Sequence, residues 1–273
     1  MEKALLLYSG GLDSRIVAKL LQNEKYQVEA LYFILPFGCT CTNCKKMENL
    51  NLTIIDVTKE PLLSEYLDIL KNPKHGTGSG INPCKDCKIF MFKKAKEYAD
   101  KNNIKIIATG EVLGQRPMSQ TRNAMKIIDK EIGFEIKRPL IEIGIKGRSR
   151  KKQMALAKKF KIKYPSPGGG CFLCEKQPAA RLKHLLKKNL ITEKTLPLTM
   201  IGRHFYTNDT WFVVARSEAE SNIISKFKTH IEDDKGKPSV YYSKQKGKQK
   251  ALELQEAYST GSEDREKFEK VKL

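Results

Sequence analysis

The sequence predicts an α/β protein, a doubly wound parallel sheet followed by a smaller α+β domain. In the first half of the 273 residues, short apolar runs alternate with segments of helical spacing, the rhythm of a parallel sheet with crossover helices. A stretch rich in proline and glycine at residues 164–170 interrupts this rhythm. Beyond residue 194 the pattern changes to short strands joined by turns. We therefore expect an α/β domain over 1–165, a basic, cysteine-bearing connector over 166–194 and a small domain over 195–273.

The individual elements follow from periodicity and from boundary residues. Strands are expected where aliphatic, β-branched and aromatic residues run together, at residues 4–8, 28–35, 52–57, 104–108 and 136–138. Helices are expected where apolar residues recur at helical spacing, at residues 14–22, 61–70, 87–102 and 149–160. In the small domain, strands at 196–201 and 211–215 flank a turn at Asn208-Asp209, and a helix follows around 251–258.

The charge of the chain favours a polyanionic partner. Lys and Arg number 51 against 31 Asp and Glu, which gives a net charge of +20. Residues 137–194 hold 17 of the basic residues and only three acids. A solvated helix face usually alternates in sign, whereas clustered Lys and Arg gain affinity for phosphate backbones by releasing counterions. A nucleic-acid surface is therefore predicted here, with Arg148, Arg150, Lys151 and Lys152 as contact residues.

No membrane or export segment is expected. Hydrophobic residues make up 40% of the chain, and the longest apolar run, residues 30–37, contains a proline and is too short to span a bilayer. The first apolar segment has the length of a buried strand rather than of a signal peptide. The sequence predicts a cytoplasmic protein without a membrane partner, and it leaves the oligomeric state open.

A glycine-rich loop joins the first strand to the first helix. It reads Ser9-Gly10-Gly11-Leu12-Asp13-Ser14. Glycines let the backbone approach a phosphate, and the free N–H groups at a helix start favour an anion. The loop lacks the Gly-Lys-Ser/Thr ending of a Walker A motif. A second polar segment, residues 108–121, begins at the end of another predicted strand, where ligands bind in open α/β sheets.

The seven cysteines form a pattern that does not suggest disulfides. Three CxxC pairs occur, at Cys41/Cys44, Cys84/Cys87 and Cys171/Cys174, with Cys39 beside the first pair. An odd number without an export signal argues against a disulfide framework. Thiolates at this spacing suit structural zinc, an iron–sulfur cluster or a persulfide relay. The helix predicted after Cys84 would lower the thiol pKa through its dipole.

In the small domain, basic and aromatic residues interleave on short strands. The segments 200–206 and 209–216 combine Arg and His with Phe, Tyr and Trp, which suits phosphate contact plus base stacking. Phe212 and Val213 fit a buried β-core equally well. We assign Arg203, His204 and Arg216 to RNA binding.

The nucleotide motifs resemble those of known enzymes. The SGGLDS loop resembles the pyrophosphate loop of the PP-loop ATP pyrophosphatases, which have an adenine nucleotide alpha hydrolase-like fold and release AMP. Residues 108–121 (ATGEVLGQRPMSQT) resemble the TGExLGQxxSQT segment of tRNA 4-thiouridine synthetases. The resemblance implies ATP with Mg²⁺, and Asp13 as a catalytic residue that positions the metal or steers the nucleotide. It implies ATP binding by Ser9, Gly10, Gly11, Asp13, Ser14, Gly110, Gln115, Arg116, Ser119 and Gln120.

The cysteine segments resemble two kinds of tRNA thiolation enzyme. NPCKDC before a helix, with GGCFL later, resembles the 2-thiouridine synthetases and matches Cys87 and Cys171 to their catalytic and sulfur-carrying cysteines. The same spacing resembles enzymes that hold a [4Fe–4S] cluster, which implies ligation by Cys84, Cys87 and Cys171, with Cys174 in reserve. Zinc is the further metal to consider. The roles of Cys39, Cys41 and Cys44 stay open.

The terminal segment adds a resemblance to an RNA-binding module. GRHF, an aromatic strand and ARSEAESN resemble the RNA-binding (NFACT-R-like) domain of NFACT-type ribosome quality-control proteins. Together these resemblances imply an ATP-dependent tRNA sulfurtransferase that adenylates a uridine carbonyl and replaces its oxygen with sulfur through a [4Fe–4S] cluster, with a cysteine persulfide relay as the alternative. The implied sulfur donor is sulfide or a cysteine desulfurase. The 2-thio and 4-thio products stay open. A small-molecule ATP pyrophosphatase and a non-catalytic RNA- or ribosome-binding protein are the alternatives.

Overall fold

The structure, a computed structural model, describes residues 1–38, 50–166, 171–262 and 264–273. The chain divides into two compact units, Met1–Lys176 and Gln177–Leu273. Each unit has its own sheet and its own core. None of the helices in the described ranges is long and apolar enough to cross a membrane.

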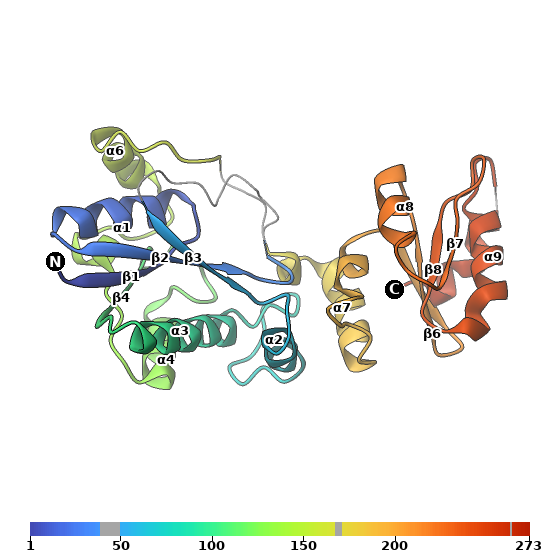
Figure 1. Cartoon of the computed structure of the whole chain (residues 1–273), viewed down its shortest axis with the longest axis horizontal. Coiled ribbons are helices and arrows are strands. Elements are labelled where there is room, and N and C mark those ends of the chain that lie inside the picture. Colours follow the sequence, from blue (N-terminus) through green and yellow to red (C-terminus); the bar gives the residue numbers. More distant parts are fainter. Residues whose placement is uncertain (39–49, 167–170, 263) are drawn as a thin grey trace. The chain divides into compact units, whose positions relative to one another are not determined.

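The first unit is built on a four-stranded parallel sheet. Its strands are β1 (Lys3–Leu7), β2 (Gln27–Ile34), β3 (Asn51–Asp56) and β4 (Ile106–Thr109), in the order β3-β2-β1-β4 (Figure 1). Leu7 on β1 lies opposite Leu31 on β2 and Thr109 on β4, so the strand ends are in register. The aliphatic run of β1 is buried on both faces, as expected for a parallel sheet covered by helices.

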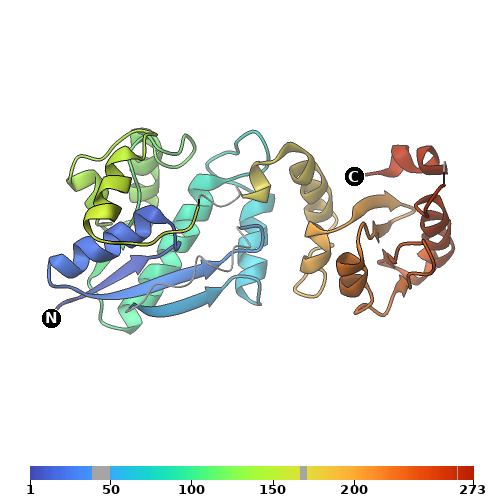
Figure 2. The same cartoon turned by 90° about the horizontal axis from the view of Figure 1, so that it is seen from above.

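Helices cover both faces of this sheet, which confirms the doubly wound prediction (Figures 1 and 2). One face packs against α1 (Leu12–Asn23) and α6 (Lys151–Lys159), and the other against α3 (Cys84–Lys101) and α4 (Arg122–Ile132). The two cores share the central strands: Leu6 faces the α1 side, whereas Leu5 faces the α3 side. The unit also contains α2 (Leu62–Lys71), α5 (Pro139–Glu142) and the 3₁₀ helix η2 (Phe172–Cys174).

Three details of the first unit differ from the sequence prediction. The strand expected at 136–138 is a single bridge between Lys137 and Ala108, because Pro139 begins α5 directly afterwards. Helix α3 begins three residues early, at Cys84. Helix α4 was not anticipated, because its N-cap, Thr121, was assigned to the nucleotide motif. The Thr121 side chain accepts a hydrogen bond from the Ala124 amide at 3.1 Å.

The second unit has an antiparallel sheet with helices beside it. Its strands, in the order β5-β6-β8-β7, are β5 (Arg203–Thr207), β6 (Thr210–Val214), β8 (Val240–Tyr242) and β7 (His230–Ile231). Its helices are α7 (Lys176–Lys187), which starts at the last residue of the first unit, α8 (Glu218–Ile224) and α9 (Lys248–Ala257). Short 3₁₀ helices complete it: η3 (Leu196–Met200), η4 (Gln245–Gly247) and η5 (Asp264–Val271).

The sequence prediction for this unit was right about the hairpin and wrong about the segment before it. Asn208 and Asp209 both have positive φ angles, +46° and +58°, as a tight two-residue hairpin turn between β5 and β6 requires. Residues 196–201, expected as a strand, contain the 3₁₀ helix η3 instead. Pro197 lacks the N–H that a strand would need there, and it suits a helical first turn.

Candidate active site

The two predicted nucleotide segments meet at one point of the sheet. From β1 the chain first adds β2 and β3 on one side and then places β4 on the other. Ligands of doubly wound sheets bind at this point, outside the carboxyl ends of the strands. A Cβ atom on Gly110, just after β4, would lie 2.9 Å from the Ser14 backbone nitrogen. The absence of a side chain at Gly110 therefore lets the second segment touch the first turn of α1.

The loop after β1 is shaped to leave the start of α1 open. Gly10 has a φ of +75°, and Gly11 is the N-cap of α1 without a side-chain hydrogen bond. Two side chains brace the loop from behind: the Ser14 hydroxyl donates to the Gly11 carbonyl at 3.0 Å, and Arg15 Nε donates to the Gly10 carbonyl at 2.7 Å. Backbone N–H groups at such a helix start bind phosphate.

Asp13 projects from the first turn of α1 and is half-buried. Its Oδ1 atom is buried and has no hydrogen-bond partner among the described residues. Burial raises the pKa of the Asp13 carboxyl, and the nearby charges of Arg150 and Arg116 offset part of that shift. An orphaned buried carboxylate oxygen beside a phosphate-type loop fits a Mg²⁺ ligand or a nucleotide contact.

Gln153 is a site residue that the sequence analysis missed. It lies on α6, is 0% exposed, and both its amide atoms lack a hydrogen-bond partner among the described residues. Its amide and that of Gln115 are near enough to Asp13 to favour the ionised carboxylate. The signal in the sequence is its position. Gln153 is the single uncharged polar residue of a basic helix, and it lies four positions before Ala157, on the side that packs inward.

The segment after β4 forms a self-braced loop. The Gly114 amide donates to the Gln120 carbonyl at 2.7 Å, and the Gln120 amide donates to the Arg116 carbonyl at 2.9 Å. Ser119 and Gln120 are buried, and Gln120 Oε1 has no partner in the part of the chain that the structure describes. Arg116 is exposed. The loop thus offers the unpartnered amide oxygen of Gln120, and it places the charge of Arg116 near Asp13.

The four basic residues near the start of α6 that are predicted to bind RNA lie in two different environments. Arg148, Lys151 and Lys152 are exposed at the start of α6. Arg150 is half-buried, and its charge acts on Asp13. The structure therefore places Arg150 beside the candidate nucleotide site, whereas its three neighbours remain on the surface.

Glu111 links the nucleotide segment to the cysteine helix. It is 1% exposed and accepts hydrogen bonds from Lys88 Nζ at 2.7 Å and Arg138 Nε at 3.0 Å. Arg138 also forks onto Asp129 of α4, with its shorter contact at 2.6 Å. Burial opposes ionisation of Glu111, but Lys88 and Arg138 outweigh it and hold the pKa of this carboxyl below its ordinary value. The sequence analysis assigned no role to this residue.

The described cysteines gather at the start of α3. Cys87 Sγ lies 3.3 Å from the Tyr66 hydroxyl, and Cys171 Sγ donates to the Phe37 carbonyl at 3.4 Å. The Ile81 amide donates to the Leu173 carbonyl at 3.1 Å, which docks the Cys171 segment beside the loop before α3. The thiols of Cys84, Cys87 and Cys171 are close enough to influence one another's ionisation.

Burial, rather than the helix dipole, dominates the acidity of these thiols. It raises the pKa of Cys87 to about 12 and that of Cys171 to about 11, and it raises the pKa of Cys84 as well. The expectation that the start of the helix would lower the thiol pKa is therefore wrong for this conformation. Cys174 is exposed.

Metal ligation was tested on the same side chains. Within the described ranges, no group of three or more Cys, His, Asp or Glu residues is arranged to hold a metal ion. The predicted set of Cys84, Cys87, Cys171 and Cys174 thus does not form a ready metal site. Cys39, Cys41 and Cys44 lie outside the described residues.

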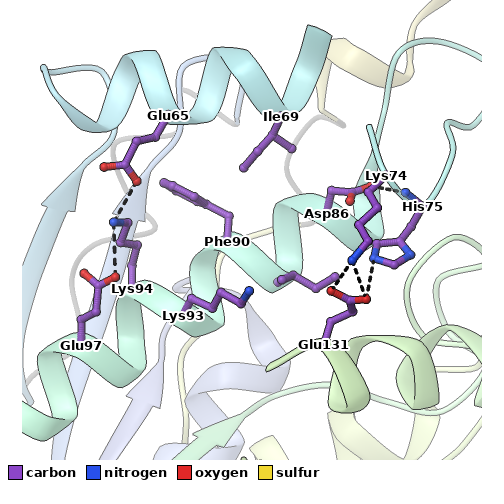
Figure 3. A pocket seen from close by; sticks show the side chains of 11 residues that line it. Glu65, Ile69, Lys74, His75, Asp86, Phe90, Lys93, Lys94, Glu97 and Glu131 are labelled. Atoms are coloured by element: carbon purple, nitrogen blue, oxygen red, sulfur yellow. Dashed lines mark hydrogen bonds and ion pairs between the residues drawn. The ribbon is translucent and has the colours of Figure 1, made fainter. Parts of the chain in front are cut away.

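A separate hollow of about 430 Å³ lies beside α2, α3 and the loop before α3 (Figure 3). Several of its polar groups are paired with one another. The His75 amide donates to Asp86 at 3.1 Å, Lys74 donates to Glu131 at 2.9 Å, and Lys94 pairs with Glu65 at 2.8 Å. The first two pairs anchor the loop at residues 72–83 to α3 and α4, and the third joins α3 to α2.

The RNA-binding prediction for His204 in the second unit must be corrected. His204 is 2% exposed, its Nε2 lies 2.7 Å from the Ile201 carbonyl, and its Nδ1 accepts from Trp211 Nε1 at 3.0 Å. Burial lowers the pKa of His204 to about 3, so the ring is neutral. A buried ring with hydrogen bonds at both nitrogens belongs to the core and cannot contact RNA.

The other two residues predicted to bind RNA in this unit, Arg203 and Arg216, are accessible but contact other side chains of the unit. The Arg203 guanidinium stacks over Tyr258 at 5.2 Å from the ring centroid. Arg216 is half-exposed and bound to Glu220, with Nη2 at 2.8 Å from the carboxylate.

Comparisons with known proteins match the first unit. Residues 1–187 match the family model described as "Thiamine biosynthesis protein (ThiI)". A relative named "Probable tRNA sulfurtransferase" from Mycoplasmopsis synoviae (strain 53) is 32% identical over 152 residues, covering 51% of this chain and 37% of the relative. An "Argininosuccinate synthase" from Picrophilus torridus is 33% identical over 114 residues, covering 40% of this chain and 29% of the relative.

A solved 4-thiouridine synthetase–RNA complex with bound ATP is 22% identical, with a TM-score of 0.49 over 72% of this chain and 52% of that chain. At that score the match has no bearing on the chemistry. The chain spans 37% of the length of the first curated sulfurtransferase.

Proposed function

The chain belongs to the ThiI family, and from that premise we propose that it is an ATP-dependent tRNA sulfurtransferase. One observation supports this most strongly: the SGGLDS loop, the segment after β4 and the thiols at the start of α3 belong to one unit, with Gly110 against Ser14 and Glu111 against Lys88. The sulfurtransferase names of the relatives agree with the proposal.

The first step is activation of a uridine. The N–H groups at the start of α1 bind the pyrophosphate of ATP, and the loop from Gln115 to Gln120 faces it. The uridine carbonyl oxygen attacks the α-phosphorus, the bond to the β-phosphate oxygen breaks, and pyrophosphate leaves. Asp13 would hold Mg²⁺, which neutralises charge on the leaving pyrophosphate. Arg150 adds a fixed positive charge on the same side.

Sulfur then replaces the activated oxygen, and two routes are proposed for its delivery. In the persulfide route, the terminal sulfur of a persulfide on Cys171 attacks the ring carbon and AMP leaves. Cys87 next attacks the Cys171 sulfur and breaks the S–S bond, and the Cys87 thiol proton, whose pKa of about 12 keeps it on the sulfur in this conformation, passes to the leaving thiouridine. Thiouridine is released, and a Cys87–Cys171 disulfide remains for an external dithiol to reduce.

The other route uses a [4Fe–4S] cluster on Cys84, Cys87 and Cys171, which would present sulfide at an open iron. Because the described side chains do not form a metal-holding group, we derive no step through a cluster or through zinc. Iron and acid-labile sulfide in anaerobically purified protein distinguish the routes. About four of each per chain favours the cluster, whereas iron near zero, before and after reconstitution, favours the relay.

The proposed partners are tRNA and a sulfur donor, which is a cysteine desulfurase whose persulfide sulfur passes to the Cys171 thiol in the relay route, or sulfide in the cluster route. The exposed basic residues at the start of α6, Arg148, Lys151 and Lys152, are proposed to contact the RNA backbone. The second unit, with its resemblance to an NFACT-R-like domain, is proposed to grip the tRNA. Flipping the uridine into the site requires such a grip.

The test is RNA-dependent ATP cleavage. We expect the chain to convert ATP to AMP and pyrophosphate, and tRNA to stimulate this conversion. Lys151→Ala with Lys152→Ala should weaken stimulation by raising the tRNA concentration needed, while the exposed control Lys101→Ala on α3 should not. A chain that cleaves ATP at a rate independent of RNA contradicts the proposal.

A second function is favoured by the similarity to argininosuccinate synthase over 40% of the chain. On this alternative, the same nucleotide site adenylates a small carboxylate or amide-forming substrate instead of RNA. AMP formation that is stimulated by a small acceptor and not by tRNA would support it. The clustered positive charge at 137–194 favours the RNA substrate.

A further inference from the structure

Helix α7 presents a cationic face that no part of the proposed reaction uses. Its sequence, KQPAARLKHLLK, contains no acidic residue. Arg181, His184 and Lys188 are spaced three and four positions apart, so they follow one side of the helix. The side chain of His184 lies against Tyr206 of β5 at 4.5 Å between centroids, and Lys188 Nζ lies 5.4 Å from the same ring.

Arg181 is the innermost cation of this face. Its Nη2 donates to the Thr199 carbonyl at 2.9 Å, at the end of η3. Its Nε is buried and lacks a hydrogen-bond partner in the described part of the chain, and no ion pair to Arg181 occurs there. A half-buried guanidinium without an anion is costly, because its charge has lost water and gained a single carbonyl hydrogen bond in return.

The neighbours of Arg181 do not supply the missing negative charge. Burial and the charge of Arg216 lower the pKa of Arg181. The carboxylate of Glu220 is already used by Arg216, through its side chain and through its backbone amide at 2.7 Å. His204 is neutral and hydrogen-bonded on both nitrogens.

A second unpartnered nitrogen lies one turn further along the helix. His184 Nε2 is buried and has no hydrogen-bond partner among the described residues. Burial and the charges of Lys188 and Lys187 lower the pKa of His184, which keeps the ring neutral at pH 7. A neutral ring beside two lysines can donate one hydrogen bond to an anion without adding a further buried charge.

We propose that Arg181, flanked by Arg216 and by the His184–Lys188 turn of α7, is a phosphate-binding site of the second unit. Two oxygens of a phosphate can accept hydrogen bonds from the paired N–H groups of a guanidinium. A phosphate also supplies the negative charge that this face lacks. The proposal rests on the RNA-modifying function proposed above, in which the phosphate belongs to an RNA backbone. The same chemistry would bind free phosphate or pyrophosphate.

The test uses the full chain and fluorescently labelled tRNA, with affinity measured by anisotropy over a series of salt concentrations. Arg181→Met should weaken binding by roughly tenfold and reduce the magnitude of the salt slope by about one. Arg181→Lys should recover the slope and part of the affinity. Lys226→Met, an exposed position in the turn after α8, is the matched control and should leave both quantities unchanged.

Stability and free phosphate separate the remaining outcomes. Arg181→Met should keep or raise the unfolding midpoint, because it removes an uncompensated charge. Wild-type affinity and salt slope in a folded Arg181→Met chain would overturn the site as an RNA contact. If the wild-type chain does not bind tRNA at all, the proposed function fails instead. Inorganic phosphate or pyrophosphate then decides for the site by stabilising wild type more than Arg181→Met, and against it by stabilising neither or both equally, because the loop after β1 binds phosphate alike in the two proteins.

Discussion

Asp13 combines a buried, orphaned oxygen with two guanidinium groups nearby, which makes it the side chain on which ATP cleavage most depends. Asp13→Asn keeps the shape and removes the charge, so AMP formation should fall by roughly 100-fold or more. Asp100→Asn, at the exposed end of α3, is the control and should retain full activity. Retention of most activity in Asp13→Asn would remove Asp13 from the mechanism.

The pH dependence of the reaction tests the environment of the same residue. Burial raises the pKa of Asp13 above its ordinary value of 3.8. Because the ionised form would hold Mg²⁺, the Mg²⁺ concentration needed for AMP formation should rise as the pH decreases through a value above 3.8. A Mg²⁺ requirement that stays constant down to the ordinary value would contradict the buried environment of Asp13.

His204 provides a pH test that is independent of function. Its folded-state pKa of about 3 lies below the ordinary 6.5, so the unfolded chain takes up the proton first as the pH falls. The second unit should keep its full stability above pH 6.5 and lose about 1.4 kcal/mol per pH unit below it. Urea unfolding, followed through Trp211, the single tryptophan, measures this.

The control for this measurement is His204→Gln, which retains an acceptor for the Trp211 indole. It should flatten the dependence between pH 6 and 4. An unchanged slope would assign the pH dependence to other groups.

Among the elements, the contact between the loop after β4 and the start of α1 depends on one missing side chain. Gly110→Ala would place a Cβ 2.9 Å from the Ser14 nitrogen, so backbone must move. We expect a loss of about 1–3 kcal/mol of stability and weaker ATP binding. Gly11→Ala is the matched control for folding, since its Cβ would lie 3.6 Å from Ser9 Oγ. Calorimetry of both variants checks this, and a wild-type midpoint for Gly110→Ala would contradict it.

The buried carboxylate of Glu111 holds together α3, α4 and the nucleotide segment. Glu111→Gln leaves Lys88 and Arg138 without their shared anion and should cost about 3–5 kcal/mol. Glu65→Gln removes an exposed partner of Lys94 and should cost less than about 1 kcal/mol. Denaturant midpoints compare the two, and equal losses would show that the buried network is not the stabilising element.

The elements that the sequence predicts well are those with a strong local signal. The parallel strands, α1, α6 and the Asn208-Asp209 turn all follow from apolar periodicity or turn chemistry. The segment at 196–201 was misassigned because an apolar run around Pro197 fits a strand and a 3₁₀ helix alike. Helix α4 is not predicted because its N-cap, Thr121, is the last residue of the nucleotide motif.

The site was predicted less completely than the fold, and for a physical reason. Motif spacing identifies Asp13 and Gly110, but which distant side chains are buried beside them is decided by tertiary packing. The face of each element that packs inward decides that Arg150 and Gln153 act on Asp13. It likewise decides that His204 is buried in a core. Thiol acidity was misjudged likewise, because burial outweighs the dipole of α3.

At the scale of the whole molecule, the two units divide the work that the proposed function requires. The first unit holds both nucleotide segments and the described CxxC thiols. The second unit offers the cationic face of α7. Each has its own core. The account therefore predicts that substitutions in the cationic face of α7 lower the affinity for RNA and leave the rate of ATP cleavage at saturating tRNA unchanged.

The most direct test of the central claim is nucleoside mass spectrometry of tRNA after incubation with the chain, ATP, Mg²⁺ and a sulfide or persulfide source. The account predicts thiouridine, formed only when ATP is present, accompanied by AMP, and absent with Asp13→Asn. Unmodified tRNA after ATP has been converted to AMP would contradict it. The nucleotide site would then serve a different acceptor.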